Sequence, residues 1–571
     1  MGKVSVICLP PGPKGEKVGV DDYLVQGHSI GDLHKLAVEP PDRAAHPSGE
    51  EMLSGILRDV ERSRLGPGQA VSILCTSAVP LHIRRTLVSR LVISLLKKRG
   101  RFLKCAANRF YFRTEKKQLF EIDSFEFSAF LSDLFGLNQT EQDFKFVQAD
   151  LHTEAHLRGE ETEIRRVSYY DRGNNILYVD RFDGQMYRLN GQSIELVDNG
   201  TDGVLFNKGP DWKPYRYAEG IPSNGLLTQT LVDDIPFQRD VFAPIMPDQQ
   251  RMTFSLWLFS LFFESLLPTK PILALIGEKG SGKTTALRRV LRFLFGPGAD
   301  VTALERERED AFVAAITHGY LVILDNLDGK IAWINDRLAV AATGSLIQRR
   351  RLYTTNEAVA YHPKCFLAIT SRNPKFKRDD VVDRLLLLKV ERLEHFAPER
   401  ELLEAVDARR DELWSELLSD LNEIVAALRQ STIKPDIQFR MSDWADLCWR
   451  IAEQQGVGAE FLSILKQLST EQSAFLLEDD LLYICLLAWL ENPRNSGREV
   501  NAGILYNELN EIALREKMEW PYNNTMSLAK RLNNVKSNLA QLIPLTIRRD
   551  ARRRTFYTFQ AIVGCPDEVT R

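Results

Sequence analysis

The 571-residue chain has few cysteines and no long apolar run. Its seven cysteines form no C-x-x-C pair, which argues against a disulfide framework or a zinc site and predicts a reducing, cytoplasmic setting. The most apolar stretch, Ser255–Leu267, is interrupted by Glu264 and followed by Pro268, so it predicts a core helix rather than a membrane span. The beginning of the sequence also lacks a signal-peptide hydrophobic region. We therefore expect no membrane partner.

The sequence also lacks a strong net charge. It has 74 basic and 77 acidic residues, a formal net charge of −3, so any nucleic-acid surface must be local. Its length predicts several domains, and 44% hydrophobic and 26% charged residues are typical of folded protein.

The most specific motif lies within Pro271–Arg289. The apolar run Ile272–Ile276 predicts a buried strand, and a helix is expected from Thr285 onward. Between them lies the glycine-rich loop, which has the pattern G-x-x-x-x-G-K-[ST] and consists of Gly277, Glu278, Lys279, Gly280, Ser281, Gly282, Lys283 and Thr284.

This pattern suits phosphate chemistry because glycines let successive backbone N–H groups turn toward phosphate oxygens at a helix N-terminus. Lys283 can reach the β- and γ-phosphates, and the Thr284 hydroxyl can ligate Mg²⁺. The sequence therefore predicts an ATP and Mg²⁺ site formed by 277–285. The alternative is a glycine-rich turn without a ligand.

A second buried strand ends at Asp325, which we predict to be a further Mg²⁺-site residue. Asn326 follows, where most ATPases of the AAA+ type have Glu to polarise the attacking water. A neutral amide can orient water but cannot take its proton. Either Asp328 does this work or turnover is slow.

Two further candidates follow in the chain. Asn373, after the expected strand Cys365–Thr370, would lie near the γ-phosphate and position water, unless Asn373-Pro374 is only a turn. Arg384 precedes the expected strand Leu385–Val390. AAA+ rings have at this place an arginine that reaches a neighbouring subunit's nucleotide, and by that resemblance Arg384 would stabilise charge on the transferring phosphoryl oxygens. The alternative is an ion pair with Asp379 or Asp380.

Several segments together resemble the P-loop ATPase of bacteriophage and mobile-element primase–helicase proteins, which are AAA+-like relatives of superfamily-three helicases. They are the glycine-rich loop, Leu324–Asn326, Ala341–Gly344, Arg351–Thr355 and Asp383–Leu385. The resemblance covers about residues 200–450 and extends toward the C-terminus. It implies a ring-forming, hexameric ATPase with DNA-tracking residues at Arg349, Arg350 and Arg351.

The N-terminal region carries a separate resemblance. A strand at Val4–Leu9 and the segment Gly19–Leu24 are similar to the closing strand and "GxDDYL" tail of a primase-type domain. If so, most of that domain is missing here, including its acidic metal ligands. A disordered polar leader is the alternative.

We expect a multidomain α/β protein with a central P-loop, AAA+-like ATPase and a β-rich N-terminal region. Residues 1–69 would form the primase-like tail and linker. A small basic α/β domain (70–160) would contain a strand at Val71–Cys75 and a hairpin at Phe110–Ile122. The remaining predicted parts are a β meander (161–224), the ATPase core (225–395), a helical lid (396–490) and a winged helix (498–561).

The winged-helix prediction rests on three short helices, Ala502–Lys517, Thr525–Leu532 and Val535–Leu542, followed by the hairpin Leu545–Phe559. Clustered basic side chains near aromatic residues suggest phosphate contacts, although a solvated basic edge is the alternative. The candidate DNA contacts are Lys530, Arg531, Arg548, Arg549, Arg552, Arg553 and Arg554.

The favoured function is an ATP-dependent DNA helicase or translocase that acts on single-stranded or forked DNA. It would serve replication of a phage, plasmid or integrated element, with a primase or another replication protein as a further partner. Two alternatives remain: a nucleotide-gated switch or effector, for instance in antiphage defence, and a DNA-binding initiator with weak ATPase activity.

Overall fold

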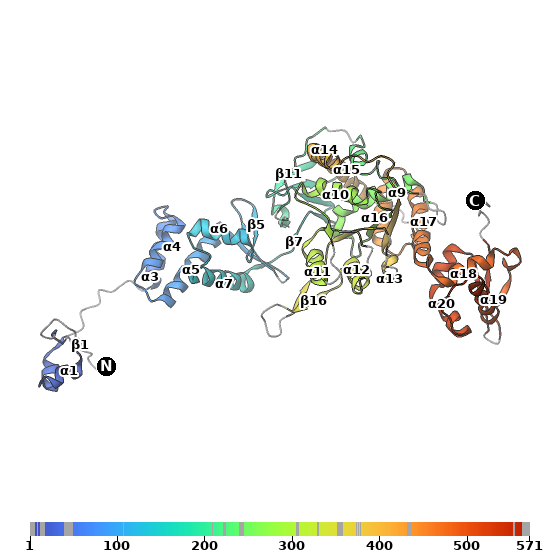
Figure 1. Cartoon of the computed structure of the whole chain (residues 1–571). Helices are drawn as coiled ribbons and strands as arrows, with labels where there is room; N and C mark the ends of the chain where they lie inside the picture. The colour runs from blue at the N-terminus through green and yellow to red at the C-terminus, as the bar shows by residue number, and fades with distance from the viewer. Residues whose placement is uncertain are drawn as a thin grey trace. The chain divides into compact units, whose positions relative to one another are not determined.

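The computed structural model describes residues 6–7, 9–11, 18–38, 49–106, 108–207, 209, 211–220, 224–238, 245–303, 308–327, 331–350, 358–361, 363–372, 374, 376, 378–430, 435–551 and 554–561. For 6, 38, 348–350 and 358–361 it describes the backbone alone. The chain divides into two compact units (Figure 1). The first comprises 1–104, 109–114 and 120–160, and the second comprises 105–108, 115–119 and 161–571.

The first unit is mainly helical; it has a four-stranded sheet in the order β5-β4-β3-β6 and a two-stranded sheet of β1 and β2. Its elements are β1 Val6–Ile7, α1 Val20–Val25, α2 Ile30–Lys35, β2 Ala37–Val38, α3 Gly49–Glu61, α4 Pro67–Thr76, α5 Leu81–Arg99, β3 Gly100–Cys105, β4 Asn108–Arg113, β5 Gln118–Glu121, α6 Phe125–Phe135, α7 Gln142–Arg158 and β6 Glu160–Glu161. The predicted hairpin is confirmed by β4 and β5.

The predicted strand Val71–Cys75 is wrong, because these residues lie in α4. Gly66 is the N-cap of this helix and Pro67 lies in its first turn, a strong helix-start signal. Val71 and Leu74 are buried with α5 in one core, at a spacing that suits a helix face.

The basic face of α5 is largely neutralised within its own unit. Arg85 donates to Asp143 (2.7 Å), and Lys97 forms an ion pair with Glu154 (2.6 Å). Arg90 and Lys98 pair with Glu50 and Glu61. The structure therefore shows this face of α5 as a charged surface on which these four basic side chains have acidic partners.

In the second unit the predicted meander is confirmed as an antiparallel sheet in the order β11-β10-β9-β8. Its turns use residues that tolerate positive φ, such as Asn175 (φ 53°) and Gly184 (φ 93°). The elements of this region are β7 Ile164–Arg165, β8 Ser168–Asp171, β9 Ile176–Asp180, β10 Gln185–Leu189, β11 Ile194–Asp198, the 3₁₀ turn η1 Thr201–Gly203 and β12 Leu205–Phe206, which pairs with β7.

The centre of this unit is a parallel sheet in the order β14-β15-β18-β13-β19. Side chains alternate between two cores, so that Leu273 and Leu275 face α10 while Ile272 and Ala274 face α11 and α12. The sheet and its flanking elements are α8 Leu226–Leu231, α9 Pro247–Ser260, η2 Leu261–Leu266, β13 Ile272–Gly277, α10 Lys283–Phe295, β14 Thr302–Ala303, α11 Glu309–His318, β15 Leu321–Asp325, α12 Ile334–Thr343, β18 Phe366–Ser371, α13 Asp379–Val382 and β19 Leu385–Val390.

An antiparallel hairpin lies between β15 and β18 in the sequence. It consists of β16 Ile347–Arg350, which is labelled in Figure 1, and β17 Ala358–Tyr361. In its register, Arg349 is opposite Val359. The predicted DNA-tracking residues Arg349 and Arg350 are therefore on β16, whereas Arg351 lies outside the described residues.

A helical region follows β19, as predicted: α14 Glu399–Ala408, α15 Arg410–Leu428, α16 Ser442–Gln454 and α17 Gly458–Leu477. It shares a core with the sheet and α10. Arg410, which is 7% exposed, donates to the carbonyls of Phe293 and Leu294 at the end of α10, and to those of Lys213 and Pro214. This side chain therefore ties α15, α10 and the segment before α8 together.

The C-terminal part has its own core, which includes residues of α17 to β22. Its elements are α18 Leu481–Leu490, η3 Pro493–Asn495, β20 Glu499–Asn501, α19 Ala502–Arg515, α20 Thr525–Leu542, β21 Leu545–Arg549 and β22 Thr555–Phe559, with the sheet order β20-β22-β21. The two helices predicted at 525–532 and 535–542 are one helix, α20. Its buried stripe continues through Leu528, Leu532, Val535, Leu539 and Leu542, so Asn533 and Asn534 do not interrupt it.

Candidate functional site

The glycine-rich loop joins β13 to α10 through backbone conformations that favour glycine. Gly280 (φ 84°) and Gly282 (φ 73°) are in the left-handed region. A Cβ atom at Gly277 would lie 2.0 Å from the carbonyl oxygen of Val390 on β19. Gly282 is the N-cap of α10, so the loop delivers its backbone directly to a helix N-terminus.

Lys283 bends back over the loop. Its Nζ donates to the carbonyls of Gly277 (2.7 Å) and Glu278 (2.8 Å) and to Oγ of Ser281 (2.9 Å). Ser281 is 1% exposed and donates to the carbonyl of Glu278 (2.9 Å). The ammonium group is thus held at the loop by neutral oxygen atoms.

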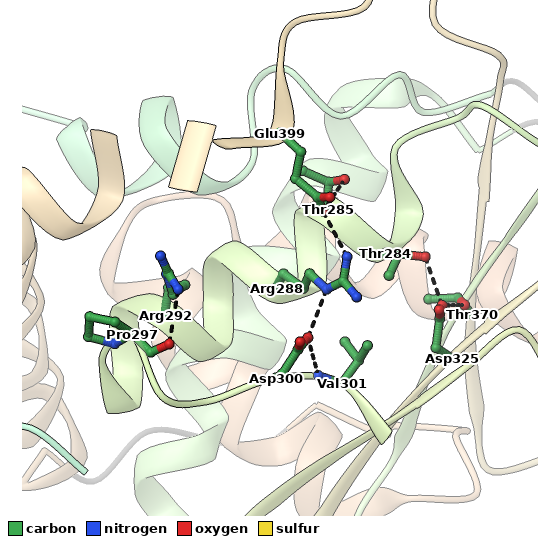
Figure 2. Close-up of polar contacts among 10 residues, drawn as sticks. All are labelled: Thr284, Thr285, Arg288, Arg292, Pro297, Asp300, Val301, Asp325, Thr370 and Glu399. Carbon is green, nitrogen blue, oxygen red and sulfur yellow. Dashed lines mark hydrogen bonds and ion pairs between the residues drawn. The ribbon is translucent and has the colours of Figure 1, made fainter. Parts of the chain in front are cut away.

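Thr284 and Asp325 meet at the carboxyl edge of the parallel sheet (Figure 2). The Thr284 hydroxyl donates to Oδ1 of Asp325 at 2.7 Å, and the Thr370 hydroxyl donates to the same oxygen at 2.6 Å. Oxygen donors of this kind suit Mg²⁺, which one or two protein groups commonly hold together with phosphate and water. Among the described residues, no group of three or more His, Cys, Asp or Glu could hold a metal by itself.

Thr370 was not predicted as a site residue. It is 1% exposed at the end of β18, and its Oγ1 accepts the backbone N–H of Asn326 (2.9 Å). A sequence pattern could have indicated it: the apolar residues 366–369 are followed by a hydroxyl residue at the end of an expected strand.

Asn326 continues directly from Asp325 with φ 56°, a conformation that Asn tolerates better than most residues. Its side chain is exposed at the end of β15. The other candidates for positioning water, Asp328 and Asn373, lie outside the described residues.

Arg384 lies at the opposite end of the sheet from the glycine-rich loop. Its carbonyl accepts the N–H of Ile272, the first residue of β13, at 2.9 Å. A strand of six residues is about 20 Å long, so the Arg384 guanidinium cannot act on the loop of its own chain.

The guanidinium of Arg384 is half-buried, and among the described residues its Nη1 has no hydrogen-bond partner. Burial lowers the pKa of this side chain from its ordinary value. Asp380 pairs with Arg378, and Asp383 pairs with Arg440. In the described part of the chain, the alternative ion pair of Arg384 with Asp379 or Asp380 is therefore not formed.

The segment after β19 contacts the outside of the glycine-rich loop. The N–H of Leu393 donates to the carbonyl of Gly280 (3.1 Å), and the ring of Phe396, 62% exposed, packs beside Gly280. Glu399, the first residue of α14, accepts from Thr285 and from Arg288 at 3.0 Å each (Figure 2). Thr285 therefore joins the loop to the helical region.

Three of the predicted DNA contacts make ion pairs within the chain. Arg548 pairs with Glu499 through two 2.7 Å bonds, Arg554 donates to Asp550 (2.7 Å), and Arg531 donates to Asp480 (2.9 Å). Lys530 and Arg549 are exposed, whereas Arg552 and Arg553 lie outside the described residues.

The fold and site define a multidomain mixed α/β protein in which a parallel sheet presents a glycine-rich loop, a threonine and a carboxylate at one edge. Residues 252–468 match the family model of the actinomycete integrative conjugative element replication protein. The match covers the loop, Asp325, Arg384 and most of the helical region, so this part of the chain is similar to those replication proteins. No curated protein matches the chain.

Solved structures give overall similarities of low identity. Two apo structures of the NrS-1 C-terminal region are each 12% identical and cover 82% of this chain and 98% of theirs, with TM-scores of 0.37 and 0.36. A crystal structure of JCV helicase is 14% identical and covers 40% of this chain and 65% of its own, with a TM-score of 0.19. In the described residues, none of the helices combines the length and apolarity needed to cross a bilayer.

Proposed function

We propose that the chain is an ATP-dependent DNA helicase or translocase whose motor is a P-loop, AAA+-like ATPase. The observation that carries the proposal is the Thr284–Asp325 contact of 2.7 Å at the edge where β13 ends in the glycine-rich loop. The strand order β14-β15-β18-β13-β19 supports it. In this order a single strand, β18, separates β15, which ends at Asp325, from β13, which leads into the loop.

The loop residues fit a nucleoside triphosphate. Backbone N–H groups of 277–285 would surround the phosphates, and Lys283 would exchange its carbonyl partners for β- and γ-phosphate oxygens. Thr284 and Asp325 would hold Mg²⁺, which neutralises phosphate charge when it is bound. The Thr370 hydroxyl fixes the orientation of the Asp325 carboxylate through its 2.6 Å bond.

The hydrolytic step would use residues from two subunits. Asn326, Asp328 and Asn373 are the candidates for positioning the attacking water. Arg384, at the far end of the sheet, would reach the nucleotide of a neighbouring copy and stabilise charge on the transferring phosphoryl group. This placement supports a homo-oligomeric ring, with a hexamer as the expected form.

DNA would be moved by the β16–β17 hairpin, whose residues Arg349–Arg351 would hold phosphates without reading sequence. The C-terminal part would bind DNA as a winged helix. The order α18, β20, α19, α20, β21, β22 supports this assignment. The match of 252–468 to a replication-protein family supports a role in replication of a mobile element, with a primase or another replication protein as partner.

The test is ATP turnover with and without single-stranded DNA, followed by strand displacement on a forked duplex. We expect DNA-stimulated turnover and displacement, and loss of both in Lys283→Ala. Lys466→Ala, which removes an exposed lysine of α17, is the matched control and should retain both. Turnover that survives in Lys283→Ala would overturn the assignment of the site.

A nucleotide-gated switch is the second candidate, and Asn326 is the observation that favours it. No carboxylate follows Asp325 directly, so proton transfer from water would be slow. A switch would bind ATP through Lys283 and change its oligomeric state, but it would turn over slowly and displace no strand. Size-exclusion chromatography with ATP, beside the turnover assay, separates the two functions.

A further inference from the structure

Glu399, the first residue of α14, lies beside the first turn of α10, where the glycine-rich loop ends (Figure 2). Its Oε1 accepts hydrogen bonds from the Thr285 hydroxyl and from Nη1 of Arg288, at 3.0 Å each. Glu401, in the same turn of α14, has an exposed side chain that makes no hydrogen bond or ion pair with the described residues. The helical region therefore places one particular carboxylate at the loop.

Arg288 fixes the position of this carboxylate. Its Nε donates to Oδ1 of Asp300 (2.8 Å) while its Nη1 donates to Glu399, so the guanidinium is held between two acidic side chains. These bonds use only Oε1 of Glu399, and in the described part of the chain its Oε2 has no hydrogen-bond partner. The side chain of Glu399 is 42% exposed. One oxygen of the carboxylate is thus held in place, and the other is open to a ligand that can donate a hydrogen bond.

The two threonines at the start of α10 point in different directions (Figure 2). Thr284 points to Asp325, on the side where Mg²⁺ and the β- and γ-phosphates are expected, whereas Thr285 points to Glu399. Phosphates at a helix N-terminus are bound by the first N–H groups of the helix. The sugar of a nucleotide is joined to the α-phosphate, at the end of the triphosphate away from the γ-phosphate. A carboxylate on the Thr285 side is therefore placed for the sugar rather than for the metal.

We propose that Glu399 accepts a hydrogen bond from a ribose hydroxyl, so that the site selects ribonucleoside over deoxyribonucleoside triphosphates. The inference rests on the proposed nucleotide site and adds its sugar specificity. An ionised carboxylate only accepts hydrogen bonds, and an acidic side chain bonds the ribose hydroxyl in dinucleotide-binding folds. Arg288 partly offsets the negative charge of Glu399, which would otherwise repel the phosphates.

The test is the dissociation constant of ADP, 2′-deoxy-ADP and 3′-deoxy-ADP for the full chain, measured by isothermal titration calorimetry. ADP has the same sugar as ATP and is not consumed during the titration. We expect at least one deoxy form to bind about 10-fold more weakly than ADP, because it lacks a hydrogen bond to a charged acceptor. Glu399→Ala should bind the three nucleotides within about twofold of one another. Glu401→Ala is the matched control and should keep the preference of the unmodified chain.

Each outcome decides the inference. Equal affinity of the unmodified chain for the three nucleotides overturns it and leaves the proposed ATP site intact. A preference for ADP that persists in Glu399→Ala also overturns it, as does equal weakening of all three nucleotides, which would mean that Glu399 only supports the loop. If no nucleotide binds to the unmodified chain, the proposed ATP site itself is wrong. The comparison on the unmodified chain decides the inference even if the variant does not fold, which circular dichroism checks.

Discussion

The hydroxyl of Thr370 donates a 2.6 Å hydrogen bond to Oδ1 of Asp325, although the two residues are 45 positions apart in the chain. The same oxygen accepts the hydroxyl of Thr284, and Thr370 Oγ1 accepts the N–H of Asn326. Thr370 therefore orients both the carboxylate and the residue that follows it.

We expect Thr370→Val to lower ATP turnover about 10- to 100-fold while nucleotide is still bound, since the Asp325 carboxylate loses a donor. The free energy of unfolding should fall by about 1–3 kcal/mol, because a buried N–H loses its acceptor. Thr370→Ser keeps the hydroxyl and should restore turnover. A loss of stability without a loss of turnover would show that Thr370 is only structural.

The position of Arg384 predicts complementation between subunits. Lys283→Ala and Arg384→Ala should each be inactive alone. In a mixture, about a quarter of the interfaces would join an intact Lys283 to an intact Arg384, so part of the turnover should return. Turnover is measured as the ratio of the two variants is varied. If no mixture is active, Arg384 does not act across an interface.

Asn326→Asp tests whether a missing proton acceptor limits turnover. Asp tolerates the positive φ at this position, and its carboxylate can take a proton that the amide cannot. We expect turnover to rise about 10-fold or more, with ATP affinity changed less than about twofold. Unchanged turnover would mean that another residue, such as Asp328, already takes the proton.

Arg410 and Arg409 form a matched pair for stability. Arg410→Lys would leave some of four backbone carbonyls without a donor, and we expect the free energy of unfolding to fall by about 3–5 kcal/mol. Arg409 has a side chain that is 49% exposed and pairs with Glu412. Arg409→Ala should therefore change the free energy of unfolding by about 0.5 kcal/mol or less. Chemical denaturation of both variants provides the comparison. If both variants lost the same free energy of unfolding, the carbonyl hydrogen bonds of Arg410 would not contribute to stability as proposed.

Local patterns in the sequence were sufficient to predict the strand, loop and helix around Lys283 and the strand that ends at Asp325. They were insufficient for Thr370, because its role depends on β18 lying beside β15 in the sheet. The apolar run Val71–Cys75 fits a strand or a buried helix, and only packing against α5 decides between them. The helices expected at 525–532 and 535–542 are one helix, because the buried stripe of α20 outweighs the low helix preference of Asn533 and Asn534.

The four carbonyl bonds of Arg410 also limit how α10 can move relative to α15 and the 213–217 segment. Helix α10 cannot slide along its axis or rotate about it without breaking the contacts at its last turn. A displacement of the loop at its first turn would therefore carry Trp414, which donates to Phe293 and stacks on Tyr215, along with it. A movement at the loop would therefore be passed along α10 to α15 and the 213–217 segment together.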